Sequence, residues 1–370
     1  MPHPLRELAQ GRPVYSIPLI IFLDDVSGNK SKQWNKHHSC YVSNGALPRQ
    51  IQEKEVNVRF VSTSPHASPG EMMQAIKTSL RRTYDSPVPA YDPQAKQECL
   101  IRVFPLFFPG DNPMQALHCS QGGLTCNFPC RTCHVGGTRE FKESDKGYAT
   151  LFNVGELRTP RDTRKDIIDR LMQALEPNAT SILGDMVAET GVKDAFSQAM
   201  VEHIIQLGID LRKEKKHSPE QIHEILAEEL EKHLEKGDII NPLLSMDGVD
   251  IHQDTPTEIL HTILLGVVKY FWGQTIALVI RAKKFTTFQA RLNSVDSGGL
   301  NIPAILADYM CHYRGSLVGK HFKTIAQVMP FVVHDIVPQD VLDAWLMIGE
   351  LVVLLWHTEI TDVEKYLVQL

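Results

Sequence analysis

Several common signatures are missing from this sequence of 370 residues. It has no excess of positive charge: 44 aspartates and glutamates outnumber 38 lysines and arginines, and the formal net charge is −6. The bulk composition therefore does not indicate a strongly basic nucleic-acid-binding face, and any such contact must be local. No uncharged apolar run is as long as a membrane span, and no N-terminal segment is typical of a signal peptide, so we predict no membrane partner.

Cysteines and catalytic motifs are also sparse. The sequence has no glycine-rich phosphate-binding loop, no Ser-His-Asp order and no internal repeat. Its seven cysteines include one close pair, which is more typical of a metal site in a reducing compartment than of a disulfide framework. With 43% hydrophobic and 22% charged residues, the chain is long enough for two or three domains, or for one domain with a large insertion.

Apolar runs in the first third of the chain predict the order strand, strand, strand, helix, strand. The helix follows a capping box at Ser68–Glu71, with Pro69 at its first position. This order is the layout of a ribonuclease-H-like core, so the predicted class is α/β, with a large and mainly helical insertion. The predicted strands are Val14–Leu23, Ser39–Val42, Glu55–Ser62 and Cys99–Phe108.

Four segments follow from this layout. Apolar residues at helical spacing, after a second capping box at Ser218–Gln221, indicate that the middle of the chain is helical. We therefore predict the first part of the catalytic core in residues 1–112, a Cys-rich loop clipped by zinc in 113–145, a helical insertion in 146–255, and a helical region that completes the core in 256–370.

Two aspartates follow the first and the last of the predicted strands. Carboxylates from different strands hold the divalent ions that phosphoryl transfer needs, so Asp24 and Asp111 predict a site for Mg²⁺ or Mn²⁺. The structural alternative is that Asp24 caps a turn and that Asp111 caps a helix through Asn112 and Pro113. Asp25 competes with Asp24 for the catalytic role.

A third acid of such a site comes from a late helix. Glu350 lies in the strongly apolar run AWLMIGELVVLLW, where a carboxylate is costly unless it is exposed, paired or metal-bound. It is the predicted third catalytic residue, with Glu359 as the next candidate. The structural alternative for Glu350 is the solvent-exposed face of its helix.

The close cysteine pair is Cys130 and Cys133, in the string CNFPCRTCHVGG. Two thiolates at this spacing can occupy two corners of a tetrahedral zinc site. The remaining ligands come either from nearby Cys126, His134 or His118, or from the distal His252 and His261. The alternative is a pair of buried free cysteines. His261 also has a structural alternative, as a core histidine one turn after Glu258, which caps the helix.

Long strings of the sequence resemble the transposases of fungal Plavaka elements, which are relatives of the CACTA group of cut-and-paste DNA transposons. The resemblance runs over nearly the whole chain, in order. The matching strings are PLRELAQGRPVYSIPLIIFLDDVSGNKSKQWNKH, GDNPMQALHCSQGGLTCNFPCRTCHVGG, PTEILHTILLGVVKYFWG and GKHFKTIAQVMPFVVHDIVP.

The resemblance implies a nuclear DDE catalytic domain that uses divalent metal to cleave transposon ends and to join them to target DNA. In this family Asp24 and Asp111 match the first two acids, and Cys130, Cys133 and His261 match groups that imply structural zinc. DNA and a second copy of the chain are the implied partners.

The sequence also departs from the family pattern. It starts almost at the first catalytic strand, and Leu117 stands where related sequences carry glutamate. These departures predict a truncated fragment of a transposase core, either active or inactive. A non-catalytic, zinc-stabilised scaffold and a metal-dependent nuclease without transposition are the two alternatives.

Overall fold

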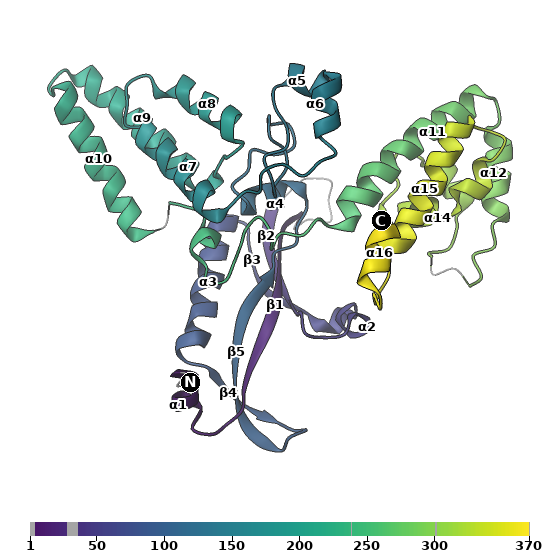
Figure 1. The fold of residues 1–370 in the computed structure, drawn as a ribbon, viewed down its shortest axis with the longest axis horizontal. Coiled ribbons are helices and arrows are strands. Elements are labelled where there is room, and N and C mark those ends of the chain that lie inside the picture. The colour runs from purple at the N-terminus through teal and green to yellow at the C-terminus, as the bar shows by residue number, and fades with distance from the viewer. Residues whose placement is uncertain (1–3, 28–35, 238, 300–301, 370) are drawn as a thin grey trace. The chain divides into compact units, whose positions relative to one another are not determined.

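The computed structural model describes residues 4–27, 36–237, 239–299 and 302–369 (Figure 1). The chain divides into two compact units, Met1–Pro256 and Thr257–Leu370. Each unit has its own hydrophobic core, and each is described by itself.

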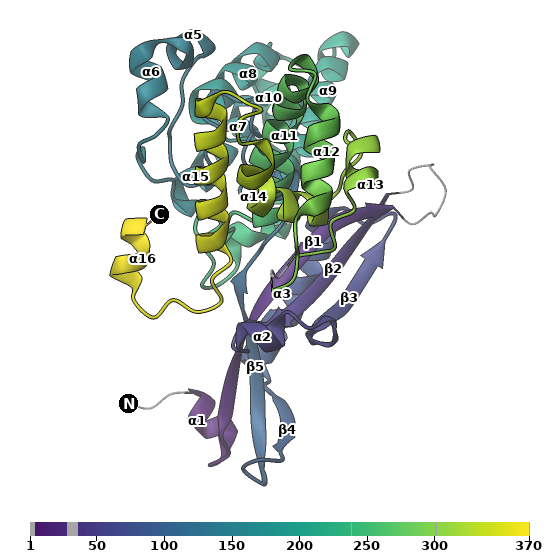
Figure 2. The same ribbon diagram turned by 90° about the vertical axis from the view of Figure 1, so that its right-hand side faces the viewer.

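The first unit contains a mixed sheet with the strand order β3-β2-β1-β5-β4 among the described residues (Figure 2). β1 pairs with β5 in parallel, whereas the β1–β2, β2–β3 and β4–β5 pairs are antiparallel. The chain is therefore a mixed α/β protein. The strands are β1 (Val14–Ser27), β2 (Lys36–Asn44), β3 (Val58–Ser64), β4 (Val88–Asp92) and β5 (Gln97–Phe107).

The strands differ from the predicted ones at several ends: β2 is longer at both ends, β5 begins two residues earlier, and three further differences bear on the site. β1 continues beyond Leu23 to Ser27, so Asp24 lies inside the strand and not at its end. Glu55–Asn57 forms a 3₁₀ turn, and β3 begins only at Val58. The sequence analysis also missed β4, a five-residue strand that forms a hairpin with β5.

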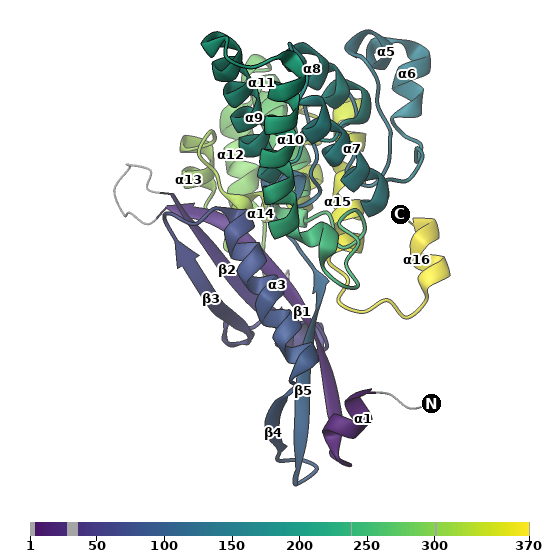
Figure 3. The ribbon, with the colours of Figure 1, turned by 90° about the vertical axis from the view of Figure 1, so that its left-hand side faces the viewer.

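Helix α3 (Pro69–Asp85) covers one face of the sheet (Figure 3). Its predicted capping box is confirmed: Ser68 Oγ accepts from Glu71 N at 3.3 Å, and Glu71 Oε2 accepts from Ser68 N at 2.8 Å. The predicted apolar face is also confirmed, because Met72, Met73 and Leu80 are buried and Ile76 packs beside them. They meet Ile21 and Leu23 of β1, which are fully buried.

Two further short helices precede β3, α1 (Pro4–Ala9) and α2 (Arg49–Gln52). After β5 the chain forms α4 (Asn112–His118), a Cys-rich loop, α5 (Arg139–Glu143) and α6 (Asp145–Thr150). Four longer helices then share a core of their own around Ile167, Leu171, Ile204, Leu226 and Leu230. They are α7 (Pro160–Gln173), α8 (Ala179–Thr190), α9 (Ala195–Glu214) and α10 (Pro219–Lys236), followed by the turn η2 (Pro242–Ser245).

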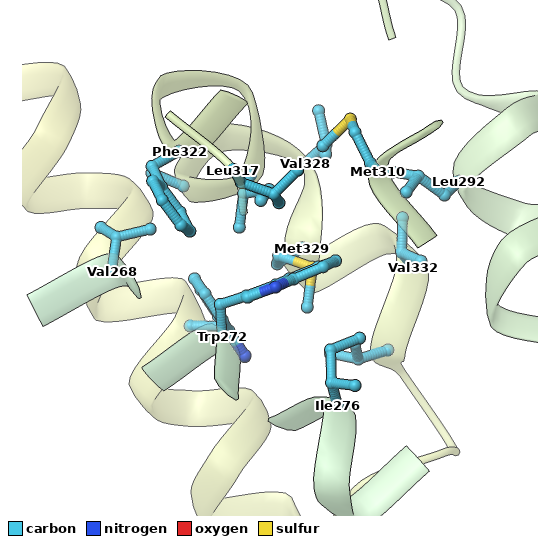
Figure 4. Packing of buried hydrophobic residues seen from close by; sticks show 14 of the residues in the cluster. Val268, Trp272, Ile276, Leu292, Met310, Leu317, Phe322, Val328, Met329 and Val332 are labelled. Carbon is cyan, nitrogen blue, oxygen red and sulfur yellow. The ribbon is translucent and has the colours of Figure 1, made fainter. Parts of the chain in front are cut away.

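Within its described residues, the second unit contains helices and connecting loops and no strand. Its core is formed by Trp272, Phe322, Val328 and Met329 with their neighbours (Figure 4). Buried Trp345 donates from Nε1 to Thr275 Oγ1 at 3.0 Å. The elements are the π-helical η3 (Leu260–Val268), α11 (Lys269–Arg281), α12 (Phe285–Ser294), α13 (Ala307–His312), α14 (Gly319–Val333), α15 (Gln339–Leu355) and α16 (Val363–Gln369).

The continuous helix Leu260–Arg281 is long and apolar enough to cross a bilayer by length and composition alone. Its buried face contributes Leu264, Val268, Trp272 and Ile276 to the core of the second unit. A core helix of this length meets the same criteria, so the finding is weak evidence for a membrane span.

Candidate metal and catalytic site

Asp24 and Asp111 lie beyond the last paired residues of two neighbouring parallel strands. The β1–β5 register ends at Ile20 and Phe107. Asp24 comes four residues after Ile20, and Asp111 comes four residues after Phe107. The carboxyl ends of parallel strands lie at the same edge of a sheet, and neighbouring strands are about 4.8 Å apart. The topology therefore brings both acids to the same end of the sheet, beyond the C-terminal ends of β1 and β5.

Asp24 and Asp25 are directed to opposite faces of β1, because successive side chains alternate along a strand. Leu23 is buried against α3, so Asp25 shares that face and Asp24 shares the other. The Asp25 carboxylate pairs with Lys36 Nζ of β2 at 3.0 Å. Asp24 is half-buried, and its Oδ1 accepts from the backbone N–H of Asp25 at 2.7 Å. Of the two acids, Asp25 thus has a cross-strand ion pair as a structural role.

Asp111 is the N-cap of α4. Its Oδ1 accepts from the backbone N–H of Met114 at 2.9 Å, and Pro113 stands in the first turn. The structural alternative for Asp111 is therefore confirmed as one role of this residue. The cap uses one carboxylate oxygen, and a carboxylate has two oxygens with about four lone pairs. Capping and metal binding are compatible.

The sequence analysis missed two polar residues beside Asp111. Gln115 lies one turn further along α4 and is 1% exposed. Its Oε1 accepts from Arg131 Nη1, and its Nε2 donates to the carbonyl of Pro256. Arg131 Nη1 also donates to the carbonyl of Thr255 at 3.4 Å. The only sequence signal for this contact is the position of Arg131 between the two cysteines.

The two thiols of the close pair are adjacent, with Cys130 Sγ and Cys133 Sγ 3.5 Å apart. Two ligands of a tetrahedral Zn²⁺ ion, at about 2.3 Å each, lie about 3.8 Å from one another. The pair therefore fits two corners of a zinc site. Burial raises the pKa of Cys133. Burial also acts to raise the pKa of Cys130, but backbone N–H groups of Thr132 and Cys133 outweigh it and lower that pKa.

The two further ligands of a tetrahedral zinc site are not found near the cysteine pair among the described residues. Among the residues that the structure describes, no group of three or more His, Cys, Asp or Glu side chains could hold a metal ion. His252 lies beside the loop, but its Nδ1 is 2.7 Å from the Arg131 carbonyl and its Nε2 is 2.8 Å from Thr163 Oγ1. Both ring nitrogens are thus hydrogen-bonded to other groups. Burial lowers the pKa of His252 to about 4.

The three other nearby candidates also have local contacts. Cys126 Sγ accepts from Gln121 Nε2 at 3.0 Å. His134 packs edge-on against the ring of Phe128, with ring centroids 6.3 Å apart. His118 of α4 is buried against Phe108 of the sheet core, with centroids 6.0 Å apart.

A buried arginine holds the Cys-rich loop. Arg158 is 3% exposed, and its Nε donates to the carbonyl of Cys130 at 3.0 Å. Its two terminal nitrogens donate to the carbonyls of Thr190 at 3.0 Å and Phe128 at 3.4 Å. One side chain therefore ties the loop to itself and to the end of α8. These hydrogen bonds order the loop without a metal ion.

The other two predicted site residues belong to the second unit. Glu258 Oε1 lies 2.8 Å from His261 Nδ1 and accepts from the backbone N–H of His261 at 2.7 Å. Glu258 thus accepts from the first turn of the helix, but it lies before the helix and not at the third helical position that its capping-box pattern predicted. Glu350 is exposed on α15 between two apolar grooves of about 870 and 620 Å³. Glu359, the next candidate, is exposed between α15 and α16.

Comparison of the chain with protein-family models and with curated proteins yields no match. The resemblance to the Plavaka transposases therefore stays a prediction from the residue strings, and the functional argument depends on the geometry of the two acids.

Proposed function

We propose that the chain is a transposon-derived DDE transposase core, a nuclear protein that cleaves DNA and joins strands with the help of Mg²⁺ or Mn²⁺. The observation that carries the proposal is the parallel β1–β5 pair, which brings Asp24 and Asp111 to one edge of the sheet. Hard divalent cations prefer oxygen ligands, so two carboxylates are suitable as part of a Mg²⁺ or Mn²⁺ ligand set.

The strand arrangement supports a ribonuclease-H-like core as the finer description. β3, β2 and β1 form an antiparallel meander, and β5 is added in parallel beside β1. In such a core one acid lies on the first strand and another just after the fourth main strand, which are the positions of Asp24 and Asp111 here. β4 is then an extra hairpin strand at the far edge.

The mechanism assigns separate tasks to these residues. A divalent ion, when bound, neutralises charge on the scissile phosphate and activates the attacking oxygen. Asp24 of β1 and Asp111, the N-cap of α4 after β5, would hold the ion, and the α4 cap fixes the rotamer of Asp111. The pattern of the sequence makes Glu350 the proposed third carboxylate, and its side chain is exposed on α15. The DNA of the transposon ends and of the target is the proposed substrate, and a second copy is the proposed partner.

We extend the proposal to a structural zinc ion at Cys130 and Cys133. The 3.5 Å distance between the thiols supports it, and the ligand set is half complete among the described residues. His261 remains the proposed third ligand. His252 would have to exchange a hydrogen bond to Thr163 or Arg131 for the metal.

Nicking of supercoiled plasmid in Mg²⁺ or Mn²⁺ tests the catalytic proposal. Asp24→Asn and Asp111→Asn should each reduce the rate about 100-fold or more, because each removes a charged metal ligand. Asparagine caps a helix as well as aspartate does, so Asp111→Asn leaves the α4 cap intact. Asp25→Asn is the matched control, because Asp25 lies on the opposite face of β1 and should be dispensable. Nicking that survives both substitutions removes the proposed site.

The second candidate function is a non-catalytic scaffold that keeps the fold. The observation that favours it is that the residues of the site already have structural roles: Asp111 caps α4, and Arg158 hydrogen-bonds within the Cys-rich loop. This function predicts that the wild-type chain folds but shows no metal-dependent nicking. It also predicts that Asp111→Ala lowers the free energy of unfolding by about 1 kcal/mol, because the α4 cap is lost.

A further inference from the structure

A row of four aromatic rings lies on the surface of the second unit. Its members come from α13 and from the first turn of α14, and each ring contacts the next. The ring centroids are 5.5 Å apart for His321 and Tyr309, 4.9 Å for Tyr309 and Tyr313, and 4.6 Å for Tyr313 and His312. The row runs from His321, which is 9% exposed, to the exposed His312.

The two tyrosines of this row are not among the buried residues that anchor α13 in the core of the second unit. Helix α13 is anchored by Ala307, Met310 and Cys311, which are at most 2% exposed. Tyr309 and Tyr313 lie on the other face of the helix, one turn apart, and remain 41% and 50% exposed. Two aromatic rings kept on the surface at this spacing form a platform that solvent can reach.

Both tyrosines line a pocket of about 520 Å³ between α12 and α13, which lie side by side (Figure 2). Gln289 of α12 donates from Nε2 to Asp308 Oδ1 at 2.7 Å across the pocket. Arg314 lies at its rim, with Cζ 5.6 Å from the ring centroid of Phe285 and Nη1 donating to the Cys311 carbonyl at 3.2 Å. The pocket thus combines flat apolar rings, an amide, a carboxylate and a cation.

We propose that this pocket binds an unpaired nucleobase of single-stranded DNA. A base stacks on Tyr309 or Tyr313, because every base has a π face and such stacking tolerates any sequence. The amide of Gln289 and the free carboxylate oxygen of Asp308 hydrogen-bond to the edge of the base. Arg314 has five N–H donors and contacts the adjoining phosphate with those that the Cys311 carbonyl leaves available.

The geometry favours a base over a methylated ammonium group, the other ligand of aromatic pockets. A cage for a cation needs rings that surround it. Here Tyr309 and Tyr313 are tilted by 44° and stand in a row. The pocket carries one carboxylate, Asp308, and one cation, Arg314, so its charge does not favour a cation, whereas the N–H donors of Arg314 suit a phosphate. The binding needs no divalent ion, so it does not depend on the proposed cleavage at Asp24 and Asp111.

Fluorescence anisotropy of a labelled oligothymidylate of about 12 nucleotides, with the full chain in EDTA, tests the proposal. Tyr309→Ala and Tyr313→Ala should each weaken binding about 10-fold, whereas Tyr309→Phe and Tyr313→Phe should stay within about twofold, because the ring is retained. Tyr270→Ala is the matched control, since Tyr270 of α11 is 72% exposed and outside the pocket. It should bind like the wild type.

Nitration of the wild-type chain gives a second readout that does not depend on variants folding. Oligothymidylate should protect Tyr309 and Tyr313 from tetranitromethane and leave Tyr270 reactive. Equal loss of affinity in the Tyr270 control, no protection, or a wild type that binds a trimethyl-lysine peptide and not the oligonucleotide would overturn the proposal. Binding in EDTA separates this site from the catalytic one, because the proposed cleavage needs a divalent ion.

Discussion

The acid pair and the cysteine pair are held in place by different means. Asp24 and Asp111 are positioned by backbone pairing, since the β1–β5 register and the α4 cap place them. Cys130 and Cys133 lie in a loop that side chains order, chiefly Arg158 through three carbonyl groups. The apolar runs that become β1 and β5 can be recognised from local patterns in the sequence, whereas a network of side chains to distant carbonyls cannot. The predictions below test this difference.

Removing the side chain that orders the loop should have the largest effect. Arg158→Met keeps much of the apolar volume but leaves the carbonyls of Cys130 and Thr190 without a donor. Each buried acceptor left unpaired typically costs about 1–3 kcal/mol, so the two carbonyls together should cost about 2–6 kcal/mol. Urea denaturation should show this loss. Arg161→Met, a change at an exposed arginine three residues away, should alter the free energy of unfolding by less than about 0.5 kcal/mol. Similar losses for both variants would mean that Arg158 does not order the loop.

The position of Asp24 in the acid pair depends on which side chains of β1 lie against α3. Leu23→Ala should lower the free energy of unfolding by about 3 kcal/mol, because Leu23 is fully buried in that core. Phe22→Ala should cost about 1 kcal/mol, since Phe22 lies on the opposite face and is 36% exposed. Thermal or urea unfolding of the two variants measures the difference. If Phe22→Ala proves the more damaging change, the face assigned to Asp24 is wrong as well.

The same contrast explains how much of the fold the sequence predicted. The capping boxes at Ser68 and Ser218 are confirmed, because both motifs are complete within four consecutive residues. β1 extends past its predicted end because Lys36 of the next strand pairs with Asp25, which makes an acid tolerable inside a strand. β4 was missed since VPAYD is short and contains proline, and only its pairing with β5 makes it a strand.

Some residues of the candidate site could be predicted from the sequence and others could not. Asp24 and Asp111 could be selected because each follows an apolar run, and the sheet register brings them to one edge. Arg158 could not be selected, because its partner carbonyl at Thr190 lies 32 residues further along the chain. The hydrogen bonds of His252 to Thr163 and Arg131 depend on contacts of the same long-range kind.

A buried histidine next to the acid site adds a pH dependence. Burial lowers the pKa of His118 to about 4, and both of its ring nitrogens lack a hydrogen-bond partner in the part of the chain described. In the unfolded chain histidine titrates near 6.5, so below that pH the unfolded state binds a proton that the folded state does not. The free energy of unfolding should therefore fall by about 2 kcal/mol between pH 7 and pH 5 from this residue.

Urea denaturation at several pH values measures that fall, and His118→Leu should flatten it. His66→Leu is the matched control, because His66 is exposed in the loop before α3. It should leave the pH dependence of the wild type unchanged. An identical pH slope in wild type and His118→Leu would show that His118 is not buried in its neutral form.

The smallest effect should come from the cysteines themselves, because Arg158 already orders their loop. Cys130→Ser/Cys133→Ser should change the free energy of unfolding by about 1 kcal/mol or less, far below the effect of Arg158→Met. The test pairs this measurement with metal analysis of the purified protein. One zinc per chain in the wild type and none in the double variant supports the proposed clip. No zinc in the wild type, or the same amount in both proteins, ends the zinc proposal. A loss near that of Arg158→Met, together with loss of zinc, would instead show that the metal orders the loop, since a complete structural site contributes folding energy directly.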